Sequence, residues 1–579
     1  MKNKLLALVL IAAMALSLAA CSTPTGSVDN DESSAPESTA EETSQEEASE
    51  GGEASEEAAP ASNDTFPTEG KIFRYAIGTE PTTLDPNKGN SIGDNEIQHA
   101  ITENLTRNTG GKVTAGMAES WDISEDGTVY TFHLRESYWS DGVKVTANDF
   151  EYSWKRLADP ATGSPYQFIV GILKNGNAII AGEAAVEDLG VKALDEMTLE
   201  VTLENPTSYF LSMLGSQSNF SPLRQDIVEQ WGEDFAATAE KNVYSGPFKL
   251  ITSENNEYQF IPNEYFWDKD NINWDGVQIS YVEKEDTRLA LYEQGELDYV
   301  AIPTAYVEQY KDQPNVNYFT NGNVDYCYIN TESENPVWGN QNFRLAMNYA
   351  LNREEYNLLA NNGVYSPYNA LCFPGLQGKD GKTYGETYDV ASYAYPMEGD
   401  QAKAQEYLAK AMEELGIANA SDIEIEFVTT DAEANKKIAE VLQEQWQNAL
   451  GIKVNIRQVT YSEIYGEVYP NLDYEIGYAG WGPDYDDPYT YLELFRSDVN
   501  WYTPYGNAEV DALLDATKTE TDLNARMDML NKAEQLLIAD GAWVPLQART
   551  AYYILDEDVT DITFYFCSVN IDWAYGDQK

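Results

Sequence analysis

The sequence is poor in the side chains on which most hydrolases depend. Its 579 residues include only two histidines, His99 and His133, and no H-E-x-x-H, G-x-S-x-G or Walker A pattern. His133 alternates with Phe132 and Leu134 in a stretch that is typical of a strand. We therefore predict that both histidines are structural and that the chain is not an enzyme.

Cysteine is also scarce. Beyond Cys21 the chain has only Cys327, Cys372 and Cys567, an odd set without C-x-x-C spacing. Such a set predicts no metal cluster, no disulfide framework and one disulfide at most. We expect no cofactor and no bound metal.

Basic residues are few, with 36 Lys and Arg against 97 Asp and Glu, for a net charge of −61. This surplus of negative charge disfavours nucleic acid and anionic lipid as direct partners. Cationic ligands are permitted but not required, since a solvated acidic surface gives the same charge.

One long apolar run exists, from Leu5 to Ala20, after Lys2 and Lys4. It is short for a membrane span and ends on small residues, which predicts a signal peptide over residues 1–20. The run closes on Leu18-Ala19-Ala20-Cys21 and resembles the lipobox of bacterial lipoproteins, which implies acylation of Cys21. An ordinary cleaved signal with an incidental Cys21 is the alternative.

Residues 21–65 are predicted to be a lipidated, acidic, disordered tether. The stretch from Ser22 to Gly70 holds fourteen acidic residues and no Lys or Arg, and it is rich in Ser, Ala, Pro and Gly. Such a composition cannot bury a core. The protein is therefore expected at the cell membrane, on its extracytoplasmic face, held by lipid alone.

The remaining residues predict a mixed α/β fold of more than one lobe. Thr146 is typical of an N-cap that begins a helix ended by Asp159-Pro160. Later the pattern alternates, with helices after Asp400 and from about Ala432 and strands that follow each of them. This alternation predicts a parallel sheet covered by helices.

A series of short motifs resembles the family 5 extracellular solute-binding proteins, the peptide receptors of ABC importers. The motifs lie in order from about Phe66 to the C-terminus, and the runs Ser164-Pro165-Tyr166 and Asp188 to Asp195 look most like oligopeptide-binding members. They are Glu80 to Pro86, Ala118 to Trp121, Asp126 to Arg135, Trp139 to Gly142, Asp149 to Leu157, Ser245 to Leu250, Gly295 to Asp298, Phe343 to Arg353, Gly480 to Tyr485 and Val544 to Leu546.

The resemblance implies a periplasmic-binding-protein-like type II fold, with two lobes, a hinge and an extra subdomain. Lobe I with the subdomain is expected at residues 66–323 and 550–579, and lobe II at 324–549. The chain would cross between the lobes twice.

The resemblance also implies a ligand site. Asp484, in Trp481-Gly482-Pro483-Asp484-Tyr485, matches the acidic residue that pairs with the α-ammonium of a peptide. Trp481 and Tyr485 are expected beside it. Tyr166 and Tyr461 are further candidates, although both could be core aromatics. A surface Asp in a turn, or part of a calcium loop, is the alternative for Asp484, but the EF-hand spacing is absent.

Cations that grip the peptide C-terminus in related receptors are missing here. The matched positions are Asn348, Asn435 and Tyr478, and Asn90 replaces a Glu expected near the ligand. Either Lys436 or another nearby base takes their place, or the C-terminus is not held by charge.

Three hypotheses follow. The first is a lipid-anchored, monomeric receptor that captures oligopeptides and delivers them to ABC transporter permease subunits. The second is a binding protein for an oligosaccharide or a metal chelate. The third is an extracellular hydrolase with paired carboxylates such as Asp486 and Asp487.

Overall fold

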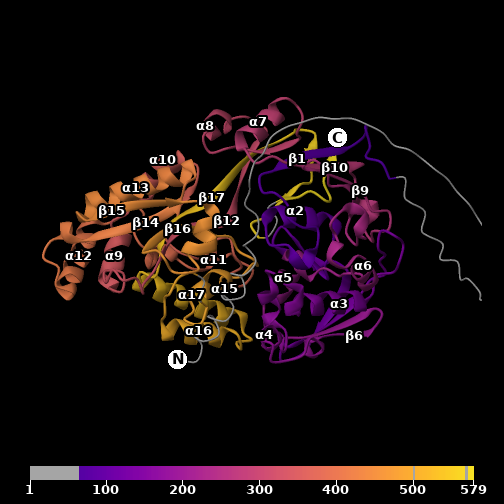
Figure 1. Ribbon diagram of the computed structural model, residues 1–579, viewed down its shortest axis with the longest axis horizontal. Coiled ribbons are helices and arrows are strands. Elements are labelled where there is room, and N and C mark those ends of the chain that lie inside the picture. Colours follow the sequence, from indigo (N-terminus) through magenta and orange to yellow (C-terminus); the bar gives the residue numbers. More distant parts are fainter. Residues whose placement is uncertain (1–63, 500–501, 568–570) are drawn as a thin grey trace, which may run out of the picture. The chain divides into compact units, whose positions relative to one another are not determined.

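The computed structural model describes residues 64–499, 502–567 and 571–579, and the residues from 63 onward form one compact unit (Figure 1). Residues 1–20, nearly all of 21–65 and the predicted lipid site Cys21 lie outside the described residues. None of the helices in the described ranges has the length and apolarity needed to cross a bilayer.

A single large sheet runs through this unit. Its strands are joined in the order β15-β14-β16-β12-β17-β11-β1-β10-β9-β8, and β13 pairs with β17. Pairs β14/β15, β14/β16, β1/β10 and β1/β11 are parallel, and the others are antiparallel. The bounds are β1 Ile72–Ile77, β8 Phe248–Thr252, β9 Glu257–Pro262, β10 Gly276–Tyr281, β11 Tyr299–Ala301, β12 Val316–Ile329, β13 Ser366–Pro367, β14 Glu424–Thr430, β15 Lys453–Val459, β16 Ile476–Trp481 and β17 Val544–Leu555.

Strands β12 and β17 connect the two ends of the sheet. They pair with each other along most of their length, but the register shifts between Thr320 and Val324. Val324 lies opposite Ala548, and Thr320 opposite Thr550. Both predicted crossings between lobes therefore fall on one pair of neighbouring strands, at an irregular step in their pairing. The lobe limits themselves stay a prediction.

A buried ion pair joins these two strands. Asp325 of β12 is fully buried, and its carboxylate accepts two bonds from Nε of Arg549, at 2.9 and 3.1 Å, and one from Nε2 of Gln547, at 2.8 Å. Gln547 in turn accepts a bond from Nδ2 of Asn361, at 2.7 Å. The network supplies the positive charge and the donors that a carboxylate in this place requires.

A second, four-stranded sheet forms within the chain between β1 and β8. Its order is β4-β5-β7-β6, and a separate hairpin, β2/β3, precedes it. The bounds are β2 Thr106–Thr109, β3 Lys112–Ala115, β4 Ala118–Ile123, β5 Val129–Leu134, β6 Val191–Asp195 and β7 Thr198–Thr202. Strand β5 includes Phe132, His133 and Leu134, as the sequence predicts, and His133 lies 2.9 Å from a carboxylate oxygen of Asp122.

The two ends of this segment are fastened together. The carbonyl oxygen of Ile101 accepts bonds from the N–H groups of both Ser245 and Gly246. A Cβ at Gly246 would lie only 2.5 Å from the backbone nitrogen of Thr102, so the close approach requires glycine. The segment that carries the smaller sheet thus begins after α2 (Ile92–Ile101) and ends just before β8 at one place.

Helices begin and end largely where the sequence predicts. Thr146 and Asp149 form a capping box on α3 (Ala147–Ala158), and α12 (Gln401–Leu415) lies between the N-cap Asp400 and the C-cap Gly416. The predicted order helix, strand, helix, strand is confirmed by α12, β14, α13 (Glu433–Leu450) and β15. Figure 1 shows α13 along these strands, where Phe427 packs on Trp446.

The other α-helices cover the sheets or connect them. They are α2 Ile92–Ile101, α4 Gly176–Ile180, α5 Phe210–Ser216, α6 Gln225–Trp231, α7 Glu285–Glu293, α8 Val307–Tyr310, α9 Gln341–Tyr349, α10 Arg353–Asn361, α11 Tyr384–Thr387, α14 Tyr461–Glu463, α15 Tyr489–Leu492, α16 Ala508–Thr517 and α17 Leu523–Asp540. Four two-residue strands near the C-terminus pair as β18 with β21 and β19 with β20. They are β18 Val559–Thr560, β19 Thr563–Phe564, β20 Ile571–Asp572 and β21 Asp577–Gln578.

Replacing Arg549 by Gln should lower the free energy of unfolding by about 2–3 kcal/mol, because it leaves the Asp325 carboxylate buried without a cation. The cost is below that of a fully enclosed pair, since the Arg549 side chain is 39% exposed. Urea denaturation measures it. Arg457→Gln on β15, whose partners Glu426 and Asp473 are exposed, is the matched control and should cost less than about 1 kcal/mol.

The double variant Asp325→Asn with Arg549→Gln should recover part of the loss, because no charge is then left buried. A loss for Arg549→Gln no larger than that of the control would show that the pair does not stabilise the crossing strands.

Candidate functional site

The turn that carries Asp484 follows directly on strand β16. After Trp481 the chain leaves the sheet through Gly482 and Pro483 and enters α15 at Tyr489. The Asp484 backbone is held from both sides, because its N–H donates to Oγ1 of Thr490 at 3.2 Å and its carbonyl accepts from Nε2 of Gln217 at 2.9 Å. Gln217 is the C-cap of α5, so the turn is fixed by contacts from two distant parts of the chain.

The Asp484 carboxylate has no such partners. Among the described residues, no cation and no hydrogen-bond donor contacts it, and burial alone raises its pKa to about 7. Tyr166 lies close enough for the Asp484 charge to add to the effect of burial in raising the pKa of its phenol. An enclosed carboxylate without a counter-charge is costly unless a ligand supplies the charge.

A cavity of about 560 Å³ opens beside this carboxylate. One wall comes from the segment with the four-stranded sheet, through residues of the short 3-10 helix Gln167–Ile172 and of α5. The opposite wall comes from the turn after β16, α15 and the ends of α16 and α17. The lining combines aromatic and aliphatic side chains with a few charged ones, as ligand sites commonly do.

Tyr485 connects the two walls. Its ring stacks on Tyr209, with centroids 4.2 Å apart and an interplanar angle of 8°. Its hydroxyl donates to Oε1 of Glu493 at 2.8 Å, and burial raises the pKa of Glu493 to about 8. The guanidinium of Arg526 lies 5.5 Å from the centre of the Tyr209 ring and is bonded on its other side to Asp487.

Four of the predicted site residues lie together. Trp481 is the last residue of β16, the turn after it carries Asp484 and Tyr485, and Tyr166 lies near the Asp484 carboxylate. Nε1 of Trp481 donates to Oγ1 of Thr490 at 3.4 Å. Because Thr490 also accepts the N–H of Asp484, the indole and the acidic turn share one anchor.

The other predicted residues lie elsewhere. Tyr461 is 71% exposed on α14 and contacts Tyr465, with ring centroids 4.8 Å apart. Asn435, in the first turn of α13, donates to Oγ1 of Thr430 at 2.7 Å, and the neighbouring Lys436 is exposed. Tyr461, Asn435 and Lys436 are not among the residues that line the cavity beside Asp484.

Asn348 and Tyr478 are enclosed by protein. Asn348 is fully buried, and its side chain donates to the carbonyl oxygens of Arg344 and Trp543. Tyr478 is 8% exposed and lies beside Asp325 and Arg549. In the conformation described, Asn348 therefore contacts no ligand. Asn90 is exposed and donates through its backbone to Asp94.

Sequence reasoning missed three residues of this region. Arg549 brings a base to the neighbourhood of Tyr478, where the sequence match expects a cation. Glu493 and Tyr209 contact Tyr485 from opposite sides. The basic side chain of Arg549 was the one feature in the sequence that could have marked it as a candidate. Its position beside Tyr478 follows only from the pairing of β12 with β16 and β17.

The acidic pair considered for a hydrolase is engaged in structural contacts. Asp487 is paired with Arg526 and also accepts the N–H of Tyr489 at 2.9 Å. Asp486 accepts the N–H of Gln377 at 2.7 Å and the hydroxyl of Tyr565 at 3.0 Å. The two carboxylates thus bond to different partners.

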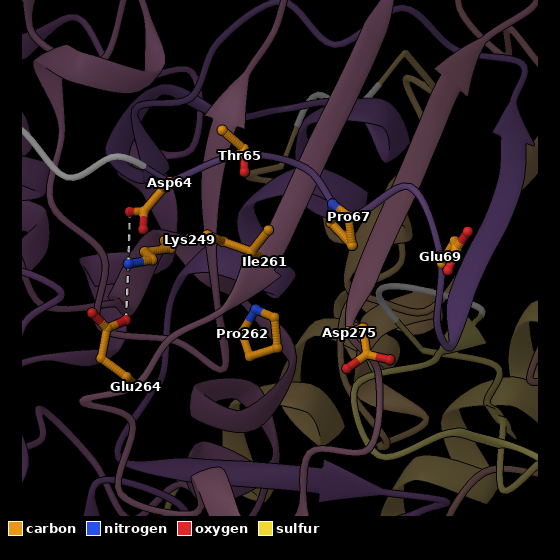
Figure 2. Close-up of a pocket in the computed structure, with 9 residues that line it drawn as sticks. All are labelled: Asp64, Thr65, Pro67, Glu69, Lys249, Ile261, Pro262, Glu264 and Asp275. Carbon is orange, nitrogen blue, oxygen red and sulfur yellow. Dashed lines mark ion pairs between the residues drawn. The ribbon is translucent and has the colours of Figure 1, made fainter.

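A separate hollow of about 540 Å³ lies where the described chain begins (Figure 2). Nζ of Lys249 lies 2.7 Å from a carboxylate oxygen of Asp64 and 2.8 Å from one of Glu264. The hollow is open and holds none of the predicted site residues. The positive charge of Lys249 is already neutralised by these two carboxylates. The ion pair with Asp64 connects the first described residues to β8.

Comparison with known proteins identifies relatives of the whole unit. Residues 112–503 match the family model described as bacterial extracellular solute-binding proteins, family 5. The oligopeptide-binding protein OppA of Bacillus subtilis is 31% identical over 503 residues, which cover 84% of this chain and 89% of that protein. Among solved structures, peptide-bound OppA of Listeria monocytogenes has a TM-score of 0.73 at 29% identity, covering 88% of this chain and all of the other.

A third relative is the substrate-binding domain of an oligopeptide ABC transporter of Bacillus anthracis. Its TM-score is 0.75 at 29% identity, over 89% of this chain and all of that one. The periplasmic-binding-protein-like type II fold that the sequence predicts is thereby confirmed.

Replacing Asp484 by Asn should stabilise the ligand-free protein at pH 8 and change it little at pH 4. Folding raises the pKa of this carboxyl from about 4 to about 7, so the charged form costs stability above pH 7, and the cost disappears below pH 4. The gain at pH 8 should be about 1–3 kcal/mol in urea denaturation, after allowance for partial exposure of the side chain.

Asp498→Asn is the matched control on the same cavity wall. Arg496 holds the pKa of Asp498 below its usual range, so this variant should be neutral or destabilising at pH 8. A loss of stability for Asp484→Asn at pH 8 would contradict the view that its carboxylate lacks a partner.

Proposed function

This chain belongs to the bacterial extracellular solute-binding proteins of family 5, and we propose that it is a membrane-anchored receptor that captures oligopeptides between two lobes and delivers them to an ABC transporter permease. The family consists of solute-binding receptors and not of enzymes. Relatives that cover most of this chain are named as oligopeptide-binding and dipeptide-binding proteins, and one is the substrate-binding domain of an oligopeptide ABC transporter.

The observation that carries the proposal is the unpaired Asp484 carboxylate at the edge of a cavity. A peptide of variable sequence offers only its backbone and its termini as constant features. The α-ammonium supplies the positive charge that Asp484 lacks. Aromatic walls and a roomy cavity accept different side chains with water between them.

Capture between lobes is supported by the crossing strands. The chain passes twice between the predicted lobes, 66–323 with 550–579 and 324–549, through β12 and β17. The two passages are adjacent, and their pairing is interrupted between Thr320 and Val324. A change of twist at this step would move one lobe against the other without breaking the rest of the sheet.

Anchoring rests on the N-terminal sequence. The signal peptide, the lipobox at Leu18 to Cys21 and the acidic stretch that follows would hold the receptor at the outer face of the membrane on an extended tether. The lipid at Cys21 would be its only attachment.

Mass spectrometry of the purified protein under native conditions tests the ligand class. We expect peptides of mixed sequence to be retained and to be released on unfolding. Retention of a single oligosaccharide or metal chelate instead would favour the second hypothesis over the first.

Asp484→Asn should weaken the binding of free peptides by roughly 30-fold or more, because removing one member of an enclosed charge pair costs about 2–5 kcal/mol. Isothermal titration calorimetry on matched free and N-acetylated peptides measures it. Acetylated peptides should bind poorly to the unmodified protein and respond little to the substitution. Asp486→Asn, two residues away and outside the cavity lining, is the control. Equal binding of free and acetylated peptides would remove Asp484 from the mechanism.

Cys21→Ser should release the protein from membranes into the medium, because the acyl chains would be absent while the folded unit remains intact. Fractionation of cells that express each form, followed by immunoblotting, measures the release. Persistence of the Ser variant in the membrane fraction would contradict the lipid anchor.

A further inference from the structure

We propose that the cavity beside Asp484 receives the side chain of the first peptide residue, and that Glu493 makes this pocket select a basic side chain, Lys or Arg. This inference rests on the proposed function, and it assigns the cavity a preference that amine capture by Asp484 does not require.

Two of the carboxylates on the cavity wall that are shielded from solvent, Asp484 and Glu493, have no cation partner in the described residues. Glu204 also lines the cavity without a cation, but it is exposed and accepts the N–H of Asn175 at 3.2 Å. Three bases line it, and each is bonded to an acid: Arg496 to Asp498 and Asp515, Lys518 to Asp515, and Arg526 to Asp487. Within the described ranges, neither Asp484 nor Glu493 has an ion-pair partner. A ligand with one ammonium group would neutralise only one of them.

Glu493 is placed for a second cation. Its Oε1 accepts the hydroxyl of Tyr485, which fixes the carboxylate on the cavity wall and leaves Oε2 for a ligand. The Asp484 charge contributes to the raised pKa of Glu493, so the two carboxylates lie within electrostatic reach of each other. An α-ammonium at Asp484 and a side-chain cation at Glu493 can therefore belong to one residue.

The walls between the carboxylates suit the stem of such a side chain. The stacked rings of Tyr209 and Tyr485 join the two walls, and the ring of Tyr489 also stacks on Tyr209. Ile172 and Met213 add aliphatic surface on the wall that carries Tyr209. Methylene groups of Lys or Arg pack on apolar surface while the charged end reaches a polar site, and aromatic faces attract cations. The volume of about 560 Å³ exceeds the needs of one side chain, so bridging waters can accompany it.

Binding of a basic side chain should also release a proton. The pKa of Glu493 is about 8, raised first by burial and then by Asp484, while the Tyr485 hydroxyl, Lys518 and Arg496 lower it. At pH 7 the free pocket therefore holds Glu493 mainly in its protonated form. A cation favours the carboxylate, so the proton leaves when Lys or Arg enters.

The test compares peptides that differ only in their first residue, Lys, Arg, norleucine or citrulline, by calorimetry at pH 7. For the unmodified protein we expect Lys and Arg peptides to bind about tenfold more tightly than their neutral counterparts, as for one partly solvated charged contact. Calorimetry in two buffers with different ionisation enthalpies should show additional proton release for the basic peptides alone.

Variants then assign the preference to one side chain. Glu493→Gln should reduce the ratio between basic and neutral peptides to less than about twofold and abolish the additional proton release. Glu229→Gln removes the same charge from α6, outside the cavity, and should leave the ratio unchanged. Asp484→Asn should weaken all four peptides alike.

A second arm needs only the unmodified protein. Moving Lys from the first to the second position should abolish its advantage. Equal affinity for Lys and norleucine peptides, or a preference that persists in Glu493→Gln, would overturn the inference while leaving the receptor proposal intact. Failure of every peptide to bind would overturn both.

Discussion

The carboxylate of Asp325 lies fully buried on one of the two strands that connect the halves of the large sheet, and its need for partners constrains how these strands pair. A charge in this place requires a base and further donors, and the opposite strand provides them through Arg549 and Gln547. Because β12 and β17 must stay in register for these bonds to form, the position of β16 and of the turn after it depends on the same pairing. The ion pair between Asp325 and Arg549 thus helps to position the candidate site, although neither residue belongs to the turn that carries Asp484.

Asp484 presents the opposite case. It follows strand β16, the neighbour of β12, yet none of the residues in the described ranges supplies it with a base, and the contacts from Gln217 and Thr490 hold only its backbone. The Asp484 carboxylate therefore lowers the stability of the free protein, whereas the Asp325 carboxylate is neutralised by Arg549. Residues that reduce the stability of the free protein are typical of binding sites, where a ligand restores what folding does not provide.

Local signals were sufficient for much of the fold, while the candidate site came from the resemblance of one short motif, and its role stays a proposal. Thr146 acts as a cap where the sequence predicts it, and a helix follows Asp400 as predicted, because capping depends on a few consecutive residues. One short motif carries Trp481, Asp484 and Tyr485, so these residues also lie close together in the fold. Arg549 and Glu493 were not predicted. Arg549 meets Tyr478 only through the strand register, and Glu493 lines the cavity only because the fold brings α15 back to the hydroxyl of Tyr485. Asn348 was matched by its position in a helix, but the packing of α9 on β17 encloses it.

The segment between Ile101 and Ser245 has joined ends, because the N–H groups of Ser245 and Gly246 both donate to the carbonyl oxygen of Ile101. A piece of chain with joined ends can be lengthened, shortened or replaced as a cassette where its contacts with the rest of the chain, such as Arg156 with Asp85 and Asn219 with Pro86, are kept. It contributes Gln217, Tyr209, the 3-10 helix and the exposed Glu204 to the cavity, whereas Asp484 and Glu493 come from the other half. Recombination or laboratory grafting of this cassette would therefore alter the shape of the pocket while Asp484 and Glu493 stay in place, so that size selectivity and the charge at these two residues can evolve separately.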